Sequence, residues 1–483
     1  MREAGSDPIF DPMAEMSRRA ALKGAAALPL VPQAVPAFAS TPAAGGARPD
    51  SDPTDAPRIQ ERPLFGAVHW TLPNGLRVVL AENRRAPVAA HYLYVSAGAG
   101  EDPHGRSGLA HFLEHMMFKG SPNIPSGALS RTVSAEGGQD NAFTSRDVTG
   151  YFQIVEASRL PLMMRMESDR LGAVLIPEAE VEPERGVIFE ERRSRISANP
   201  RARFMERFDA AMWGPQHWRG RPLIGWEDEI RAITREDMVR FHAARYAPSN
   251  CVLVVAGDVR EADLRRWADE FYGPIPGRAD PGRDRAPPPA RSPEARLVAQ
   301  DPAVREASFL RGFAAPSATF GETEMSDPLE VAAHVLGSGP GSRLHAALVE
   351  TGLAVGAGAS YDGDVVGVGT LVVYATPRPG VSPEQIEEAV NRTLGTLVQE
   401  GISEGETRRA IRQQTAGALL ALDGLGAAPR MLGGSLAIGL PIEAVEFWPQ
   451  RIAAVTPEAA TRAIRGVLSD NPVSTAGWLM PSA

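Results

Sequence analysis

A proline-rich segment between Tyr272 and Ala295 divides the 483-residue chain into two parts of similar length. The segment includes Ala286-Pro287-Pro288-Pro289, many charged residues and no hydrophobic periodicity, which is typical of a semi-rigid connector. We therefore place a linker at 276–296, a first domain at 60–275 and a second domain at 297–483. Each part is long enough to form a domain with its own core.

Both parts mix strands and helices in a similar order. In the first part, a turn at Pro73-Asn74-Gly75 predicts a hairpin, and the pattern predicts strands over 76–80, 88–97 and 251–258 and a helix from about Gly108. In the second part, strands are expected over 308–314 and 370–375, and a helix over 328–336. This order predicts an α+β protein made of two related α/β-sandwich domains, although the residue identity between the two parts is slight.

The cysteine content and the net charge limit the kinds of site that the chain can hold. Cys251 is the only cysteine, which excludes an intramolecular disulfide and a four-cysteine zinc site. Any metal must therefore be bound by His and carboxylate side chains. The formal net charge of −9 at pH 7 disfavours a nucleic-acid-binding protein, which normally shows a basic face.

The first residues have the order of an export signal. The pair Arg18-Arg19 precedes an apolar stretch over 24–35, and Ala37-Phe38-Ala39 has the form of a signal-peptidase site. We expect a signal peptide of the twin-arginine type at 1–39, a disordered lead-in at 40–59, and a periplasmic protein. The alternative is a disordered basic start. No other segment approaches the roughly 18 consecutive apolar residues of a membrane span, so we expect none.

The segment from Gly108 to Phe118 carries the residues that indicate chemistry. His111, Glu114 and His115 stand at i, i+3 and i+4, so a helix presents all three on one face. Their neighbours are mostly apolar, and a buried ionisable group is costly unless it is paired or bound to a metal. The order H-x-x-E-H is the inverzincin signature, in which two imidazoles bind zinc. The alternative is two core histidines and a buried ion pair.

A third metal ligand is expected between Pro183 and Arg193. Glu184 and Glu191 lie on one face of a predicted helix, whereas Glu190 points about 100° away from Glu191, toward solvent. Glu191 is therefore the candidate ligand. Taken by itself, this segment also fits an ordinary charged helix with Glu–Arg pairs.

Residues 60–275 resemble the pitrilysin family of zinc metallopeptidases, in the branch of the mitochondrial processing peptidase and its bacterial relatives. In that family a liganding Glu follows the second histidine by 76 positions, with a supporting Glu seven positions earlier; here these positions are Glu191 and Glu184. The likeness continues more weakly through the second half. Other similar stretches are Gly137 to Thr144, Asp147 with Tyr151, Gly225-Trp226 after His217, and Val254 to Asp258.

The resemblance implies a fold, an activity and a role for each site residue. It implies two LuxS/metallohydrolase-like halves around a clamshell chamber, and a zinc-dependent endopeptidase that hydrolyses extended peptides or small unfolded polypeptides. His111, His115 and Glu191 would bind one zinc ion per chain, and Glu184 would orient a ligand. Glu114 would act as general base, taking a proton from water and delivering it to the leaving amine.

The resemblance also implies a strand that binds the substrate backbone. It would consist of Asn141-Ala142-Phe143-Thr144 and would pair with an extended peptide through main-chain hydrogen bonds. The alternative for this strand is plain core structure.

In the second half the sequence departs from the catalytically complete relatives. These carry an Arg and a Tyr that bind the substrate carbonyl and the developing oxyanion, but here Val349 and Val355 stand in their places, in a motif one residue shorter. Valine donates no hydrogen bond. We therefore expect a heterodimer with a homologous, zinc-less chain that supplies the Arg and the Tyr. A self-sufficient homodimer that uses Tyr361 or a backbone donor is another possibility.

A non-catalytic structural or assembly subunit of the same fold is the alternative function. Such subunits usually have a broken zinc motif, whereas every zinc-site residue is present in this chain. The sequence therefore favours the peptidase, with the caution that a fold does not determine a function.

Overall fold

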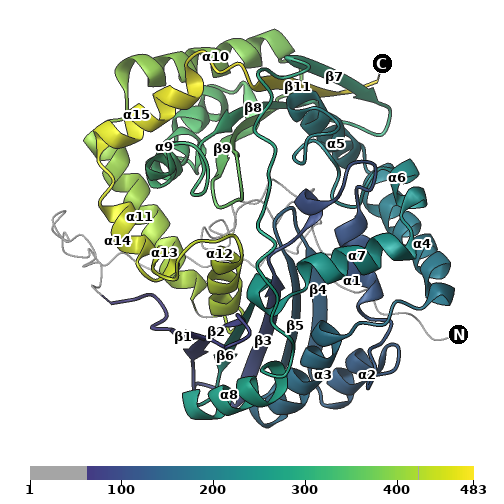
Figure 1. The fold of residues 1–483 in the computed structure, drawn as a ribbon. Helices are drawn as coiled ribbons and strands as arrows, with labels where there is room; N and C mark the ends of the chain where they lie inside the picture. Colours follow the sequence, from purple (N-terminus) through teal and green to yellow (C-terminus); the bar gives the residue numbers. More distant parts are fainter. Residues whose placement is uncertain (1–61, 423, 483) are drawn as a thin grey trace, which may run out of the picture.

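Two β-sheets organise the fold, one in each half of the chain, and helices pack against both of them (Figure 1). The computed structural model describes residues 62–422 and 424–482. The expected signal peptide at 1–39 and lead-in at 40–59 lie outside these residues. The predicted α+β class with two similar halves is confirmed.

The first sheet has six strands in the order β1-β2-β6-β3-β5-β4. The β2 and β6 strands run parallel, and all other neighbours run antiparallel. The predicted turn at Asn74-Gly75 joins β1 to β2 and sets Thr71 opposite Arg77. The strands are β1 (Val68–Thr71), β2 (Arg77–Glu82), β3 (Val88–Val95), β4 (Gln139–Thr144), β5 (Thr149–Glu156) and β6 (Cys251–Gly257).

The second sheet repeats this topology with five strands in the order β7-β11-β8-β10-β9. Its β7 and β11 strands run parallel, and the remaining neighbours run antiparallel. The order and directions match those of β2-β6-β3-β5-β4 in the first sheet, so the two halves share one architecture. The strands are β7 (Arg296–Asp301), β8 (Ser308–Ala315), β9 (Ala354–Asp362), β10 (Gly369–Pro377) and β11 (Ser474–Pro481).

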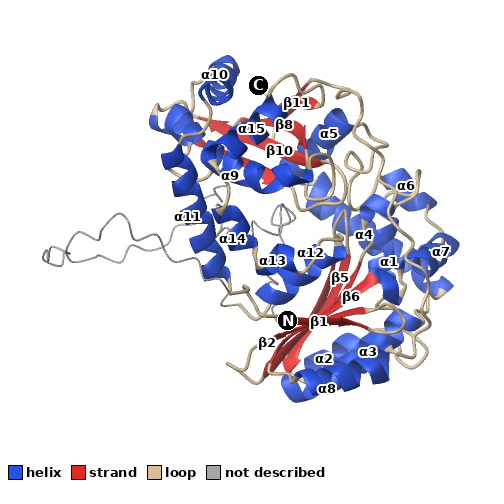
Figure 2. Ribbon diagram, turned by 60° about the vertical axis from the view of Figure 1, so that its left-hand side comes forward, coloured by secondary structure: helices blue, strands red, loops and turns tan. Residues whose placement is uncertain are grey.

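Helices of the first half cover one face of the first sheet (Figure 2). Side chains alternate between the two faces of a strand, so Leu93 of β3 and Leu253 of β6 share a buried apolar cluster with Leu109 and Phe112 of α1. The helices are α1 (Leu109–Met116), α2 (Ala128–Ala135), α3 (Leu160–Gly172), α4 (Glu178–Arg192), α5 (Pro200–Trp213), α6 (Glu227–Ala232), α7 (Arg235–Arg245) and α8 (Glu261–Trp267).

The second half follows the same scheme, and its two longest helices, α10 and α11, have 18 residues each. Capping boxes start both of them, because Ser382 and Ser403 each accept a hydrogen bond from the backbone three residues later. None of the helices in the described part of the chain is both long and apolar enough to cross a membrane. The helices are α9 (Ser326–Gly337), α10 (Pro383–Glu400), α11 (Glu404–Ala421), α12 (Gly434–Ala437), α13 (Glu443–Glu446), α14 (Trp448–Ala453) and α15 (Pro457–Leu468).

Each half also lends a helical segment to the sheet of the other half. The α5 helix of the first half packs on β7 and β11, where a Cβ atom on Gly477 would lie only 2.6 Å from the Phe208 ring. In return, the segment Pro429–Gly433 and α12 pack on β3 and β6, where a Cβ on Gly433 would lie 2.2 Å from the Tyr94 ring. The two halves therefore share one apolar core.

The segment between the halves contains no helix or strand from Gly273 to Ala295, and β7 begins at Arg296, the last residue of the predicted linker at 276–296. It is nevertheless anchored to the first half. The buried guanidinium of Arg285 lies 2.8 Å from Glu101. It also lies 2.9 Å from Asp147, which belongs to the turn between β4 and β5. The indole of Trp218 donates a hydrogen bond to the Ala286 carbonyl at 3.0 Å. The linker therefore fixes the end of β4.

Candidate metal centre

The α1 helix carries the H-x-x-E-H residues, and a side chain from outside the helix caps its N-terminus. The buried carboxylate of Asp102 accepts hydrogen bonds from the backbone amides of Gly108 at 2.7 Å and Ala110 at 2.8 Å. These bonds satisfy amides that the first turn of a helix leaves without partners. Burial raises the pKa of the Asp102 carboxyl to about 7. The cap fixes where the α1 helix starts.

His111, His115 and Glu191 come together as a group that could hold a metal ion. Their candidate ligand atoms all lie within 4.8 Å of one another, and this is the one such group among residues 62–422 and 424–482. Glu191 Oε2 is 3.5 Å from His111 Nε2 and 3.3 Å from His115 Nε2. A tetrahedral ion with bonds of about 2.0–2.1 Å separates its ligand atoms by roughly 3.3 Å, so these residues fit zinc.

The α4 helix places Glu184 and Glu191 on the side that faces α1. The side chain of Glu191 is 15% exposed, whereas the side chain of Glu190 is 61% exposed and pairs with Arg193. Glu184 accepts a hydrogen bond from His115 Nδ1 at 2.7 Å and forms an ion pair with Lys119. The helical periodicity correctly separated Glu191 from Glu190.

Glu184 holds His115 in the orientation that a metal ligand needs. Because Glu184 binds Nδ1, the other ring nitrogen of His115 is directed at Glu191. His111 differs, since its buried Nδ1 has no hydrogen-bond partner among the described residues. A hydrogen bond therefore fixes the ring orientation of His115, whereas no such bond to Nδ1 from the described residues fixes the ring of His111.

The electrostatics of the metal-free group favour a positive charge between the carboxylates. Burial lowers the pKa of His115, but hydrogen bonds to Glu184 and Glu191 outweigh it and raise the pKa to about 9. Burial raises the pKa of Glu191, but its hydrogen bonds to His111 and His115 bring it well below its usual range. The pKa of Glu184 is also lowered, because its bonds to His115 and Lys119 outweigh burial. A metal cation would take the place of the proton on His115.

Glu114 lies on α1 between the two histidines and is tied to the neighbouring sheet. Its carboxylate accepts a hydrogen bond from the hydroxyl of Thr144, the last residue of β4. Glu114 is buried, so this bond satisfies a polar group that has little access to water. Thr144, predicted to bind substrate, thus contacts the predicted general base.

The β4 strand forms an edge of the first sheet and pairs only with β5. The Ala142 amide donates to the Asn141 side chain at 2.8 Å instead of to β5, so it faces the open edge. Phe143 points into the core, where its ring meets the Tyr94 ring edge-on at 6.0 Å. The structure therefore divides the four predicted substrate-strand residues among the edge, the core and Glu114.

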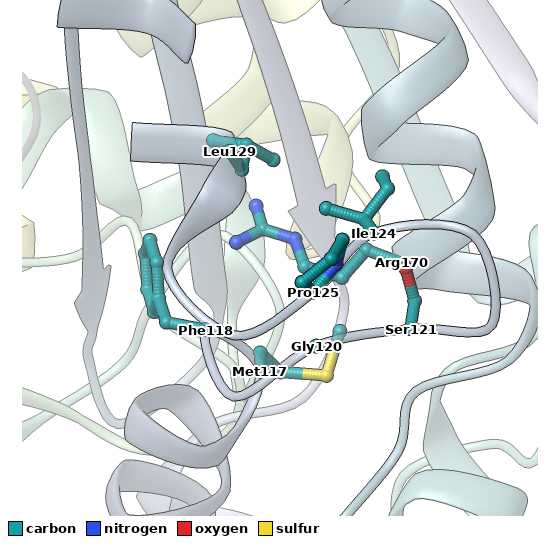
Figure 3. Close-up of a pocket in the computed structure, with 8 residues that line it drawn as sticks. All are labelled: Met117, Phe118, Gly120, Ser121, Ile124, Pro125, Leu129 and Arg170. Carbon is teal, nitrogen blue, oxygen red and sulfur yellow. The ribbon is translucent and has the colours of Figure 1, made fainter. Parts of the chain in front are cut away.

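A small pocket opens just beyond α1 (Figure 3). The guanidinium of Arg170 lies over the Phe118 ring at 4.8 Å and pairs with Glu167 at 2.6 Å. The pocket is mostly apolar and separate from the candidate metal ligands. It is lined by Met117, Phe118, Gly120, Ser121, Ile124, Pro125, Leu129 and Arg170.

The second half carries valines at the two positions where the resemblance implied an Arg and a Tyr. Val355 lies on the edge strand β9 with 48% of its surface exposed, and Val349 lies in a π-helical turn over His345–Glu350. Tyr361 is buried, and its hydroxyl donates to the Pro316 carbonyl at 2.6 Å. The possibility that Tyr361 replaces the missing donor is therefore not supported.

Two cations at the site were not predicted from the sequence. Lys119 contacts Glu184, and Arg195 Nη1 lies 2.8 Å from Glu191 Oε1. A signal existed for each: Lys119 is one of only two lysines among 50 basic residues, and Arg195 stands at i+4 from Glu191.

Comparison with known proteins shows the family of the chain. Residues 77–224 match the family described as Insulinase (Peptidase family M16), and residues 232–414 match the Peptidase M16 inactive domain. A Mycobacterium leprae protein named as an uncharacterized zinc protease is 30% identical over 400 residues, which cover 81% of this chain and 87% of the relative. The chain belongs to peptidase family M16. This membership confirms the resemblance to pitrilysin-type peptidases.

Other M16 proteins match this chain over different shares of their length. A probable mitochondrial-processing peptidase subunit beta of Schizosaccharomyces pombe is 30% identical over 210 residues, 44% of this chain and 46% of that protein. The structure of a protease from Helicobacter pylori has a TM-score of 0.76 at 24% identity, covering 86% of this chain and 99% of that one. Pitrilysin has a TM-score of 0.73 at 20% identity, and the match covers 88% of this chain but 45% of pitrilysin. These structures support the two-domain M16 fold.

Proposed function

We propose that this M16 chain is a zinc-dependent endopeptidase that hydrolyses extended peptides or small unfolded polypeptides. The observation that carries the proposal is the convergence of His111, His115 and Glu191 within 4.8 Å, on and beside the helix that bears Glu114. A relative named as a zinc protease supports the same class. A non-catalytic subunit of the same fold is less well supported, because every residue of the predicted centre is present.

Each residue of the centre would have a separate role in the reaction. His111, His115 and Glu191 would hold the zinc ion, which when bound acidifies water and polarises a carbonyl. Glu114 would take the proton from the attacking water and give it to the leaving amine. The Thr144 hydroxyl would hold Glu114 in place, and Glu184 would keep His115 Nε2 directed at the centre.

The substrate would bind along the open edge of β4. An extended peptide added to this edge gains main-chain hydrogen bonds, which tolerate many side chains. The Ala142 amide faces this edge and Thr144 ends it beside Glu114, so a bound backbone would run toward the general base. Such a site suits peptides without stable structure, within the chamber of a clamshell.

Metal analysis and kinetics test the proposal together. Wild-type protein should contain about one zinc ion per chain, and His111→Ala and Glu191→Gln should lose it. Glu114→Gln should retain zinc and lose the hydrolysis of an unstructured peptide. Retained zinc in either ligand variant would overturn the ligand assignment, and an active Glu114→Gln variant would remove Glu114 from the base role.

The active enzyme would be a heterodimer with a homologous, zinc-less partner. Val349 and Val355 cannot donate hydrogen bonds to an oxyanion, and the Tyr361 hydroxyl is engaged in the core. The name of the yeast relative, a subunit of a processing peptidase, is consistent with a two-chain enzyme. If the single chain hydrolysed an unstructured peptide as fast as its mixture with the partner, this part of the proposal would be wrong.

The site of action would be the periplasm, reached through a twin-arginine signal at residues 1–39. The support is the Arg18-Arg19 pair with its apolar stretch and cleavage motif. Export of a fused reporter should stop when both arginines are replaced by lysine. Export that continues unchanged would contradict the twin-arginine route.

A further inference from the structure

The carboxylate of Glu191 contacts the two histidines of the candidate metal centre with one oxygen and Arg195 with the other. Its Oε2 atom is 3.5 Å from His111 Nε2 and 3.3 Å from His115 Nε2. Its Oε1 atom is 2.8 Å from Nη1 of Arg195. The two oxygens therefore have different partners: one faces the imidazoles and the other is held by a guanidinium.

Arg195 stands four residues after Glu191, a spacing at which side chains on one helix meet. The α4 helix ends at Arg192 and continues as a π-helical turn over Arg193–Ser197, closed by a hydrogen bond from the Ala198 amide to the Arg193 carbonyl at 2.8 Å. Such turns are rare and often occur at functional sites. Arg193 instead pairs with the outward-facing Glu190. Arg193 thus pairs with a glutamate that faces solvent, and Arg195 pairs with one that faces the candidate metal centre.

The burial of the pair places the cation at the rim of the centre. The side chain of Arg195 is 43% exposed, whereas that of Glu191 is 15% exposed. The guanidinium can therefore restrain the carboxylate while solvent screens its charge. A restraint of this kind acts on the orientation of a ligand, as hydrogen bonds to the outer atoms of metal ligands commonly do.

We propose that Arg195 is a positioning residue that holds Glu191 as a single-oxygen ligand and thereby strengthens zinc binding. This inference rests on the proposed zinc centre. A catalytic zinc site needs three protein ligands and one open position. If Glu191 turned and bound through both oxygens, it would compete for the open position. The ion pair between Arg195 and Oε1 opposes that rotation.

Two substitutions at Arg195 and one matched control test the inference. Arg195→Met removes the guanidinium and keeps much of the side-chain length, and Arg195→Lys keeps the charge without the planar fork. Arg193→Met makes the same change in charge, two residues away, on an exposed side chain that pairs with the exposed Glu190. Each full-length variant is compared with wild type for zinc affinity, by competition with a chelator, and for the visible spectrum of the cobalt(II)-loaded protein.

The expected results separate Arg195 from its neighbour. Arg195→Met should bind zinc about 10- to 100-fold more weakly and show a cobalt spectrum shifted toward higher coordination number. Arg195→Lys should recover part of the affinity, and Arg193→Met should match wild type in both measurements.

Two other results would overturn the inference and point to different failures. If Arg195→Met binds zinc as tightly as Arg193→Met, or more tightly, with an unchanged cobalt spectrum, Arg195 does not position Glu191. If wild-type protein binds no zinc at all, the proposed function fails and this inference falls with it.

Discussion

At the residue scale, His115 is the side chain on which the centre depends most. It stands between two carboxylates, with Glu184 on Nδ1 at 2.7 Å and Glu191 near Nε2 at 3.3 Å. In the metal-free protein both carboxylates stabilise the imidazolium. Metal binding therefore has to displace a proton from a site that retains it well.

Zinc affinity should accordingly increase with pH. Hydrogen bonds to Glu184 and Glu191 raise the pKa of His115 from 6.5 to about 9, despite burial. Binding then releases about one proton, so the apparent affinity should rise roughly tenfold per pH unit between about pH 7 and 9. Calorimetry in buffers of different ionisation enthalpy measures this release. An affinity independent of pH in this range would contradict the assignment.

The same shift predicts how the stability of the metal-free protein depends on pH. A group whose pKa is raised on folding stabilises the folded state fully below its unfolded pKa, here 6.5, and loses this effect as the pH rises through about 9. Chemical denaturation of metal-free protein should therefore give a lower free energy of unfolding at about pH 9.5 than at pH 6. Replacing His115 by Gln should flatten this difference, and an equal slope in both proteins would contradict it.

The candidate ligands were predicted from the sequence, but their supporting cations were not. His111, Glu114 and His115 are neighbours on one helix, and periodicity alone separates Glu191 from Glu190. The i+4 spacing of Arg195 from Glu191 was an available local signal. Lys119 reaches Glu184 because α1 packs against α4, and a local pattern does not contain this packing of two helices.

At the element scale, the start of α1 depends on Asp102. Its two oxygens accept hydrogen bonds from the Gly108 and Ala110 amides. Gly108 has a φ of +88° and packs against the Ile224 carbonyl, where a Cβ would lie at 2.1 Å. The α1 helix is thus fixed at its first turn, ahead of His111 and His115.

Removal of this cap should weaken both the fold and the metal centre. Asp102→Ala leaves two buried amides without partners, so the free energy of unfolding should fall by about 2 kcal/mol or more. Asp102→Asn keeps one carbonyl acceptor and should lose less. Urea denaturation measures both, with Asp263→Ala, in the first turn of α8, as an exposed control. Equal stability of wild type and Asp102→Ala would contradict the capping role.

The observed strands and helices lie close to their predicted ranges, because the sequence patterns that predict them are local. The strand expected over 88–97 is Val88–Val95, and the helix expected over 328–336 is Ser326–Gly337. By contrast, the pairing order within each sheet joins strands far apart in the chain. The β2 and β6 strands, neighbours in the sheet, are separated by most of the first half.

At the scale of the whole molecule, the two halves are interlocked. The α5 helix covers the second sheet, and the segment Pro429–Gly433 covers the first (Figure 1). Gly312 and Gly477 leave space for Phe208, and Gly433 leaves space for Tyr94. These contacts join residues from opposite ends of the chain, so the sequence predicted two related domains but not this exchange.

Separated halves should therefore fail to fold alone. Each fragment, cut near residue 290, would expose an apolar sheet face that the other half normally covers. We expect each to bind a hydrophobic dye and to lack a cooperative unfolding transition, and an equimolar mixture to recover it. Cooperative unfolding of either isolated fragment would contradict this account.

The linker should contribute to stability beyond its role as a connector. Arg285 is the shared partner of the buried carboxylates of Glu101 and Asp147. Arg285→Met leaves both without this partner and should cost about 3–5 kcal/mol. Arg291→Met, an exposed position in the same linker, serves as control and should stay within about 0.5 kcal/mol of wild type. Equal stability of the two variants would show that the linker is only a tether.

The most direct test of the central claim is a zinc K-edge X-ray absorption measurement on the purified chain. The account predicts about one zinc ion per chain, with two imidazole nitrogens and carboxylate oxygen at about 2.0–2.2 Å. The imidazole scattering should weaken in His115→Ala. Protein without bound zinc, or zinc whose surroundings contain no imidazole, would contradict a centre formed by His111, His115 and Glu191.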